Sequence, residues 1–167
     1  RPHFLFNSLN AVLSLIRSEP RRAETALEEL AELYRALMRD HRDLLPLADE
    51  IALCRQYLDL EKLRLGERLN IEWEIADVPS DLKVPPLMLQ PLLENAVYHG
   101  IEPSGEAGTV RICFTRNADE LHIDITNPCL GRYAVQGGNH MALANIRERL
   151  ALYYDLEARL ETNEVTL

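Results

Sequence analysis

The sequence contains no apolar run long enough to cross a lipid bilayer. Its longest early apolar stretch, 4–16, is interrupted by Asn7, Ser8 and Asn10 and is too short to span. No signal peptide opens the chain, and no internal repeat or low-complexity tract is visible. Only 3 cysteines are present, and their odd number and spacing match no metal site, which favours free thiols in a reducing compartment.

Positive charge is also scarce. The 18 Lys and Arg residues are outnumbered by 27 Asp and Glu residues, which gives a formal net charge of -9 and a pI near 5.0. Such a chain repels nucleic-acid phosphates at long range, so no direct nucleic-acid binding is expected. The apolar fraction of 47% and the charged fraction of 27% are typical of globular proteins and exclude a disordered or fibrous chain. We therefore expect an acidic, globular, cytoplasmic domain.

Helical periodicity dominates residues 1–67. Apolar residues recur every three or four positions in two segments, 3–18 and 23–38, which predicts two helices separated at Pro20. A third helix is predicted over 47–65. The first helix carries an apolar side made of Leu9, Leu13 and Ile16. Two antiparallel helices cannot bury both of their apolar stripes alone, so we expect the hairpin to dimerise into a four-helix bundle.

After Gly66 the pattern changes. Alternating apolar and polar residues predict three strands, at 70–76, 110–116 and 120–126. A helix is expected from Pro85 and Pro86 to Gly100, because proline suits the first turn of a helix and glycine its end. Further along, we expect a loop at 130–139, a helix at 140–154 and a strand at 157–161. The predicted fold class is α+β, an N-terminal helical hairpin followed by an α/β sandwich, with the boundary near residue 67.

His3 and Asn7 stand four residues apart near the start of the chain and therefore share one face of a helix. An exposed imidazole at this place can act as a nucleophile, and the amide beside it can orient a phosphoryl group or a water molecule. A helix-terminal histidine without chemistry is the alternative interpretation.

A second motif, LQPLLENAVYHG, covers 89–100 and carries Glu94, Asn95 and His99. Helical spacing places Asn95 and His99 together at the edge of an apolar stripe. An amide oxygen is a hard, neutral ligand that suits Mg²⁺ already coordinated in part by phosphates, and the histidine can donate to phosphate oxygens. An amphipathic helix with polar edge residues is the alternative.

A third motif, GGNHMALANIRERL, begins with Gly137 and Gly138 and contains Asn145. Glycines that lead into a helix present unpaired backbone N–H groups, which can hold phosphate. An ordinary junction between a loop and a helix is the alternative.

Taken in this order, PHFLFNSLN and the two later motifs resemble the LytS/YehU class of sensor histidine kinases, and within it the alginate and fimbrial sensors. The resemblance implies a sandwich of the GHKL (Bergerat) type that binds ATP and Mg²⁺ after residue 67. It implies that His3 is the phosphoacceptor, and that the phosphoryl group passes to an aspartate of a LytTR-type response regulator. Residues 1–67 would then be the dimerisation and phosphotransfer region, and 68–167 the catalytic domain.

The resemblance also implies roles for single residues. Asn95 would be the Mg²⁺ ligand and His99 a phosphate contact. The implied nucleotide-binding residues are Asn95, His99, Asn127, Gly131, Gly138 and Asn145. Because Phe4 occupies the position where many histidine kinases place an acid, Glu94 is the predicted base or orienting partner, and it joins His3 and Asn7 in the predicted catalytic set.

Departures from the pattern predict a weak or slow nucleotide site. Asn127 replaces the aspartate that usually reads adenine, at a cost of about 1 kcal/mol or ~5-fold in affinity. Cys129, His140 and Ala142 stand where glycines are expected. These changes leave open a non-catalytic regulatory dimer that controls a response regulator without using ATP. A plain ATPase is disfavoured, since Pro91 occupies the position where such enzymes place a catalytic glutamate.

The chain ends at Leu167, short of the last strand that the sheet of this class usually includes. We therefore expect a fragment, the cytoplasmic part of an inner-membrane protein whose sensory and membrane segments lie upstream of Arg1.

Overall fold

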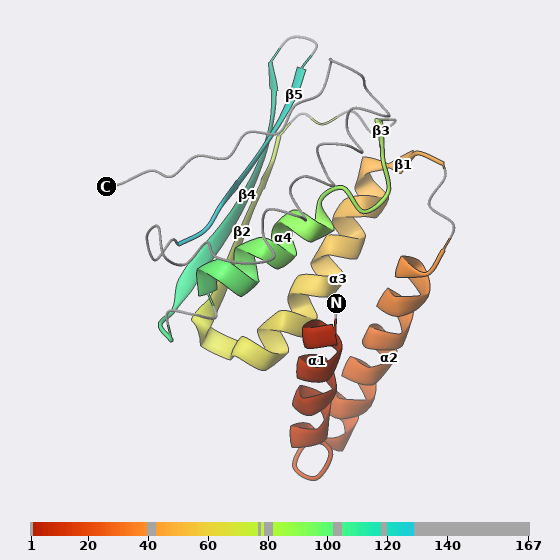
Figure 1. The fold of residues 1–167 in the computed structure, drawn as a ribbon, viewed down its shortest axis with the longest axis vertical. Coiled ribbons are helices and arrows are strands. Elements are labelled where there is room, and N and C mark those ends of the chain that lie inside the picture. Colours follow the sequence, from red (N-terminus) through yellow and green to blue (C-terminus); the bar gives the residue numbers. More distant parts are fainter. Residues whose placement is uncertain are drawn as a thin grey trace.

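The computed structural model describes residues 2–39, 43–76, 78, 82–101, 105–117 and 120–128. Helices α1 (Pro2–Leu15) and α2 (Pro20–Leu37) form a hairpin, and α3 (Leu47–Leu65) packs against both. Figure 1 shows α3 lying between this hairpin and a sheet, so that one helix joins the two halves of the molecule. The mixed helix and sheet content confirms the predicted α+β class.

Pro20 begins α2, because proline at the first helical position loses no hydrogen bond. The predicted stripe of α2 is buried in large part, through Ala23, Ala26, Leu30 and Leu33. In α3 the predicted core positions are buried as well; they are Leu47, Ile51, Cys54, Leu58 and Leu65. These two helices therefore pack as their periodicity predicts.

Helix α1 has two apolar sides, and the hairpin buries the less obvious one. Phe4, Ser8 and Val12, which recur every four residues, face the bundle. The predicted stripe faces outward instead; its members Leu9, Leu13 and Ile16 are 38%, 63% and 48% exposed. A second copy of the hairpin is the partner that the sequence analysis predicts for this stripe.

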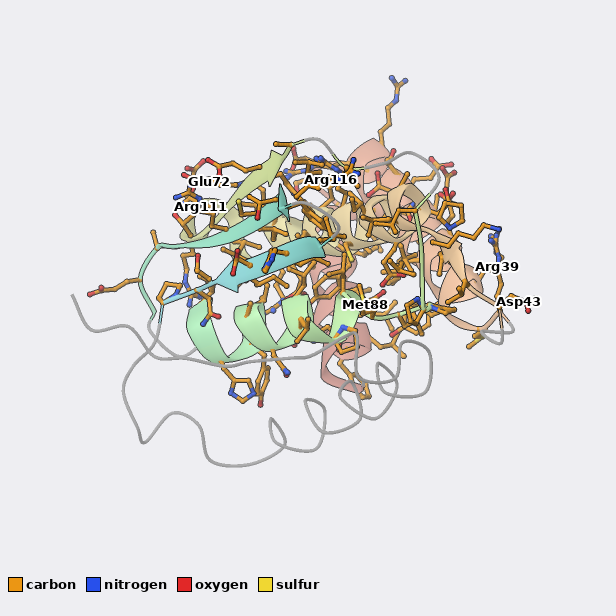
Figure 2. All side chains as sticks on the ribbon, turned by 90° about the horizontal axis from the view of Figure 1, so that it is seen from above. Arg39, Asp43, Glu72, Met88, Arg111 and Arg116 are labelled. Carbon is orange, nitrogen blue, oxygen red and sulfur yellow. The ribbon has the colours of Figure 1, made fainter. Side chains whose placement is uncertain are left out.

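The sheet has the order β2-β4-β5. Strand β2 (Leu69–Ile75) pairs parallel with β4 (Gly108–Asn117), which pairs antiparallel with β5 (Glu120–Thr126), so all three predicted strands are confirmed. One face is buried under α3 and α4, and the other is polar. Figure 2 shows Glu72 and Arg111 on the face away from α4. A two-stranded ribbon of β1 (Leu45–Pro46) and β3 (Lys83–Val84) was not predicted.

Helix α4 (Gln90–Ala96) begins five residues later than predicted. The expectation of a start at Pro85 and Pro86 is wrong, because a residue before proline avoids the helical region and Leu87 adopts a left-handed φ of 55°. Pro91 occupies the first turn instead. The helix continues into a π-helical turn, η2 (Val97–Ile101), and a 3₁₀ turn, η1 (Gly66–Arg68), follows α3.

The two cysteines in the described ranges, Cys54 and Cys113, are free thiols. Within those ranges no helix has both the length and the apolar character needed to cross a membrane. The loop, helix and strand predicted beyond residue 129 lie outside the described residues.

Candidate nucleotide and phosphotransfer site

His3 lies in the first turn of α1, and its side chain is outside the described atoms. The next residue, Phe4, is buried against two aromatic rings of the neighbouring helices. Its ring centroid is 6.3 Å from that of Tyr34 on α2 and 5.0 Å from that of Tyr57 on α3. Asn7 is half-buried one turn further on. The turn that carries His3 is therefore held by aromatic packing, although no acidic residue follows the histidine.

Glu94 lies in the second half of α4, and its charge acts on residues of α2 and α3. Its Oε1 accepts a hydrogen bond from Nε2 of Gln90, at 3.3 Å. Burial raises the pKa of Tyr34, and the Glu94 carboxylate raises it further. Burial also raises the pKa of Cys54 on α3, with Glu50 and then Glu94 as further causes. Tyr34 thus stacks on Phe4 and interacts electrostatically with Glu94.

Asn95 is 9% exposed in the last turn of α4, and His99 is half-buried in η2. The rings of Tyr98 and His99 meet edge to face, with centroids 4.8 Å apart. Asn95 thus lies near the end of the α-helical part of this segment, and His99 lies in the π-helical turn that continues it.

The end of β5 lies directly against the end of η2. A Cβ on Gly100 would lie 2.6 Å from Nδ2 of Asn127 and 3.0 Å from the carbonyl oxygen of Pro128. A Cβ on Gly108 would lie 2.8 Å from side-chain atoms of Ile101 and Pro128. Only glycine allows this close approach, which joins two motifs that stand far apart in the sequence.

The amide of Asn127 has a defined orientation at this junction. Its Nδ2 donates to the carbonyl oxygen of Pro128 at 2.8 Å, which leaves Oδ1 as the acceptor end of an exposed side chain. Asn127 can therefore accept a hydrogen bond from an amino group, although without the charge of an aspartate.

The two ends of the α4–η2 segment are held by side chains of the preceding helix and turn. Glu50 of α3 accepts hydrogen bonds from the backbone just before α4. Nη2 of Arg68 donates to the carbonyl oxygen of Ile101 at 3.2 Å. The sequence analysis missed Glu50, because an acid in the first turn of a helix is commonly explained by the helix dipole.

A buried ion pair lies on α3. Nη2 of Arg64 is 2.8 Å from Oε2 of Glu61, and the two side chains are 19% and 4% exposed. Both belong to the stretch YLDLEKLR in the second half of α3. The structure gives them a local role, in which the pair links successive turns of the helix that joins the two halves.

The described residues are compatible with a Mg²⁺ ion that is coordinated mainly by the phosphates of a nucleotide. Across the described ranges, no group of three or more His, Cys, Asp or Glu side chains is arranged to hold a metal ion. Mg²⁺ in nucleotide sites usually takes one or two protein oxygens and keeps phosphate and water ligands, so a single amide oxygen such as that of Asn95 would be sufficient there. The predicted contacts at Gly131, Gly138 and Asn145 lie outside the described residues.

Comparison with known proteins shows which sequences the chain resembles. Residues 1–69 match the model of a family described as histidine kinase. This segment contains the helical hairpin, all of α3 and both members of the Phe4–Tyr57 contact.

The whole chain is similar to sensor proteins of this class. It is 31% identical over 170 residues to the sensor histidine kinase BtsS of Escherichia coli K12. This alignment covers 99% of this chain and 30% of that protein. It is 30% identical over 164 residues to the sensor protein LytS of Oceanobacillus iheyensis, covering 89% and 28%. It is 26% identical over 173 residues to the sensor protein kinase HptS of Staphylococcus aureus USA300, covering 96% and 33%. The chain spans about a third of the length of these curated relatives.

Proposed function

We propose that this chain is the kinase portion of a two-component sensor, in which ATP phosphorylates His3. The proposal rests on the packing of the His3 turn against Tyr34 and on the electrostatic effect of Glu94 on that tyrosine, within a chain similar over nearly its whole length to sensor histidine kinases. The division into a phosphotransfer region, 1–67, and a GHKL-type ATP-binding domain, 68–167, is part of the proposal.

In this proposal each residue has a defined task. ATP with Mg²⁺ supplies the phosphoryl group and the positive charge that neutralises it. A neutral ring nitrogen of His3 would attack the γ-phosphorus of ATP, the bond from this phosphorus to the β–γ bridging oxygen would break so that ADP leaves, and the other ring nitrogen would release its proton. Asn95 would hold the Mg²⁺ and His99 would contact phosphate, while Oδ1 of Asn127 would accept from adenine.

Two side chains would assist the transfer. Glu94 would accept the proton or orient the imidazole, in place of the acid absent after the histidine. Its electrostatic effect on Tyr34, whose ring stacks on that of Phe4, supports this role. Asn7, one turn after His3 and half-buried, would orient the phosphoryl group or a water molecule.

The exposed stripe of α1 supports a homodimer through the N-terminal helices. It comprises Phe6, Leu9, Leu13 and Ile16, whose exposed fractions run from 38% to 66%. Leu27 of α2 is also 48% exposed. Pairing two hairpins into a four-helix bundle would remove this apolar surface from water.

Phosphorylated His3 would pass its group to an aspartate of a LytTR-type response regulator. The sensory and membrane segments would belong to the rest of the protein, and this chain would be its cytoplasmic part. Within the class, we place it with the sensors that control alginate and fimbriae, on the resemblance of the three motifs.

A second candidate is a regulatory dimer that holds a response regulator without using ATP. Asn127 favours it, because a neutral amide at the adenine-reading position binds more weakly than a carboxylate. The orientation of that amide favours the kinase instead, since Oδ1 is the acceptor end.

Labelling with γ-labelled ATP and Mg²⁺ separates the two candidates. The kinase predicts label that is acid-labile and alkali-stable and that disappears in His3→Gln. The matched control is His122→Gln, which changes an exposed histidine of β5 and should keep the label. Label that survives His3→Gln would place the acceptor elsewhere, and a complete lack of both label and nucleotide binding would favour the regulatory dimer.

A further inference from the structure

Glu50 is a carboxylate with no exposed surface, located in the first turn of α3. Its Oε2 accepts the backbone N–H of Leu87 at 3.1 Å, and its Oε1 accepts the backbone N–H of Leu89 at 3.1 Å. Leu89 is the N-cap of α4, and Leu87 is the residue with the left-handed φ of 55°. Both carboxylate oxygens thus bind the turn from which the helix of Asn95 starts.

This arrangement lowers the stability of the folded state. A buried carboxylate loses its hydration, and a left-handed leucine is strained, so an apolar side chain and a relaxed turn would serve a core better. Two charge-assisted hydrogen bonds with defined directions instead fix where the turn lies. The two hydrogen bonds therefore orient α4, which follows this turn.

The surrounding contacts form one joint between the top of α3 and the segment before α4. Strands β1 and β3 pair through Leu45 with Val84 and Pro46 with Lys83. The backbone N–H of Leu47 donates to the carbonyl oxygen of Leu82 at 2.8 Å. Figure 1 shows this joint at the upper end of α3, and Figure 2 labels Met88 at the start of α4.

We propose that Glu50 is a positioning residue, which sets the place of Asn95 by fixing the start of α4. Asn95 lies six residues after Leu89, about 9 Å along the helix, and α4 has no flexible break between them. Movement of the upper end of α3 is thereby transmitted to the metal-binding amide. The consequence for Mg²⁺ rests on the proposed function, whereas the fixed turn does not.

The test uses Glu50→Gln, which keeps the size of the side chain. Its single oxygen accepts one N–H, while its NH₂ group faces the other N–H and cannot accept it. The control is Val12→Ala, a buried change in α1 that loosens the core without touching the joint. Each protein is titrated with Mg²⁺ at fixed ATP, with nucleotide binding as the signal, and amide hydrogen exchange is followed at Leu87 and Leu89.

We expect Glu50→Gln to raise the Mg²⁺ concentration for half-maximal binding by about tenfold, the effect of losing a hydrogen bond to a charged group. Exchange at Leu87 and Leu89 should be accelerated by a similar factor. Val12→Ala should change the Mg²⁺ midpoint and the exchange rates at Leu87 and Leu89 by no more than about twofold. A loss of folded protein lowers the amplitude of the binding signal and not its midpoint.

The outcomes separate this inference from the proposed function. An unchanged Mg²⁺ midpoint and unchanged exchange in Glu50→Gln would overturn the role of Glu50. If the unaltered protein binds no nucleotide, the proposed function fails, and hydrogen exchange alone tests the role of Glu50. Faster exchange in Glu50→Gln that is confined to 87–96 would then support the joint. Exchange like that of Val12→Ala would overturn it.

Discussion

Replacing Gly100 with alanine tests the contact between the end of η2 and the end of β5. The added Cβ would lie 2.6 Å from Nδ2 of Asn127 and 3.0 Å from both Cβ of Asn127 and the carbonyl oxygen of Pro128. The amide end of Asn127 can swing away, but this breaks its 2.8 Å hydrogen bond to Pro128. The backbone oxygen cannot move without shifting the chain.

The expected cost follows from three terms. Overpacking of this kind costs about 1–3 kcal/mol. Loss of the hydrogen bond adds about 1 kcal/mol. Alanine returns about 1 kcal/mol, because it is the better helix former and Gly100 is not in the left-handed region. The net expectation is a free energy of unfolding lower by about 2 kcal/mol, together with weaker nucleotide binding through the displaced Asn127.

Urea unfolding measures the first effect, and the double variant Gly100→Ala, Asn127→Ala identifies its cause. Removing the Asn127 amide should recover about 1 kcal/mol of the loss. Gly105→Ala is the control: it has open space but a φ of +67°, so its cost is backbone strain and should be additive with Asn127→Ala. A Gly100→Ala protein more stable than the original would refute the predicted clash at Gly100. The higher helix propensity of alanine would then be the only effect of the substitution.

Two further predictions concern the surface. Leu13→Glu, at a side chain 63% exposed, should raise the dimer dissociation constant at least ~10-fold in sedimentation, because burial of a leucine contributes about 2 kcal/mol; unchanged dimerisation would exclude this stripe from the interface. Burial and the hydrogen bond to Glu74 raise the pKa of Cys113, so Glu74→Gln should lower that pKa and speed thiol labelling near pH 7.5, by less than about tenfold. Cys54 should stay unlabelled in the folded protein, and mass-spectrometric mapping of labelled peptides distinguishes the sites.

Much of the fold could be predicted because its periods are local. The stripes of α2 and α3 follow from spacings of three and four residues, and the alternation of β2, β4 and β5 from a spacing of two, which any stretch of chain carries within itself. The start of α4 could not be predicted, because the turn before it depends on Glu50, which stands 37 and 39 positions away from its two partners.

The site divides in the same way. Spacing alone predicted that Asn95 and His99 share one side of a helix; in the structure Asn95 belongs to α4 and His99 to the π-helical turn that follows it. It did not reveal that Asn127 lies against Gly100, or that the charge of Glu94 acts on Tyr34 of the hairpin. Those pairings depend on how the β5 end and α2 are brought to α4 by packing.

The sequence by itself therefore determined which segments are helices and strands and which side chains carry the candidate chemistry, since propensity and periodicity act between near neighbours. Only the tertiary structure decided which apolar side of α1 is buried, where α4 begins, and which motif residues meet. A buried side and an exposed side can have the same composition, and a partner tens of residues away is chosen by the shape and hydrogen bonds of the assembled core.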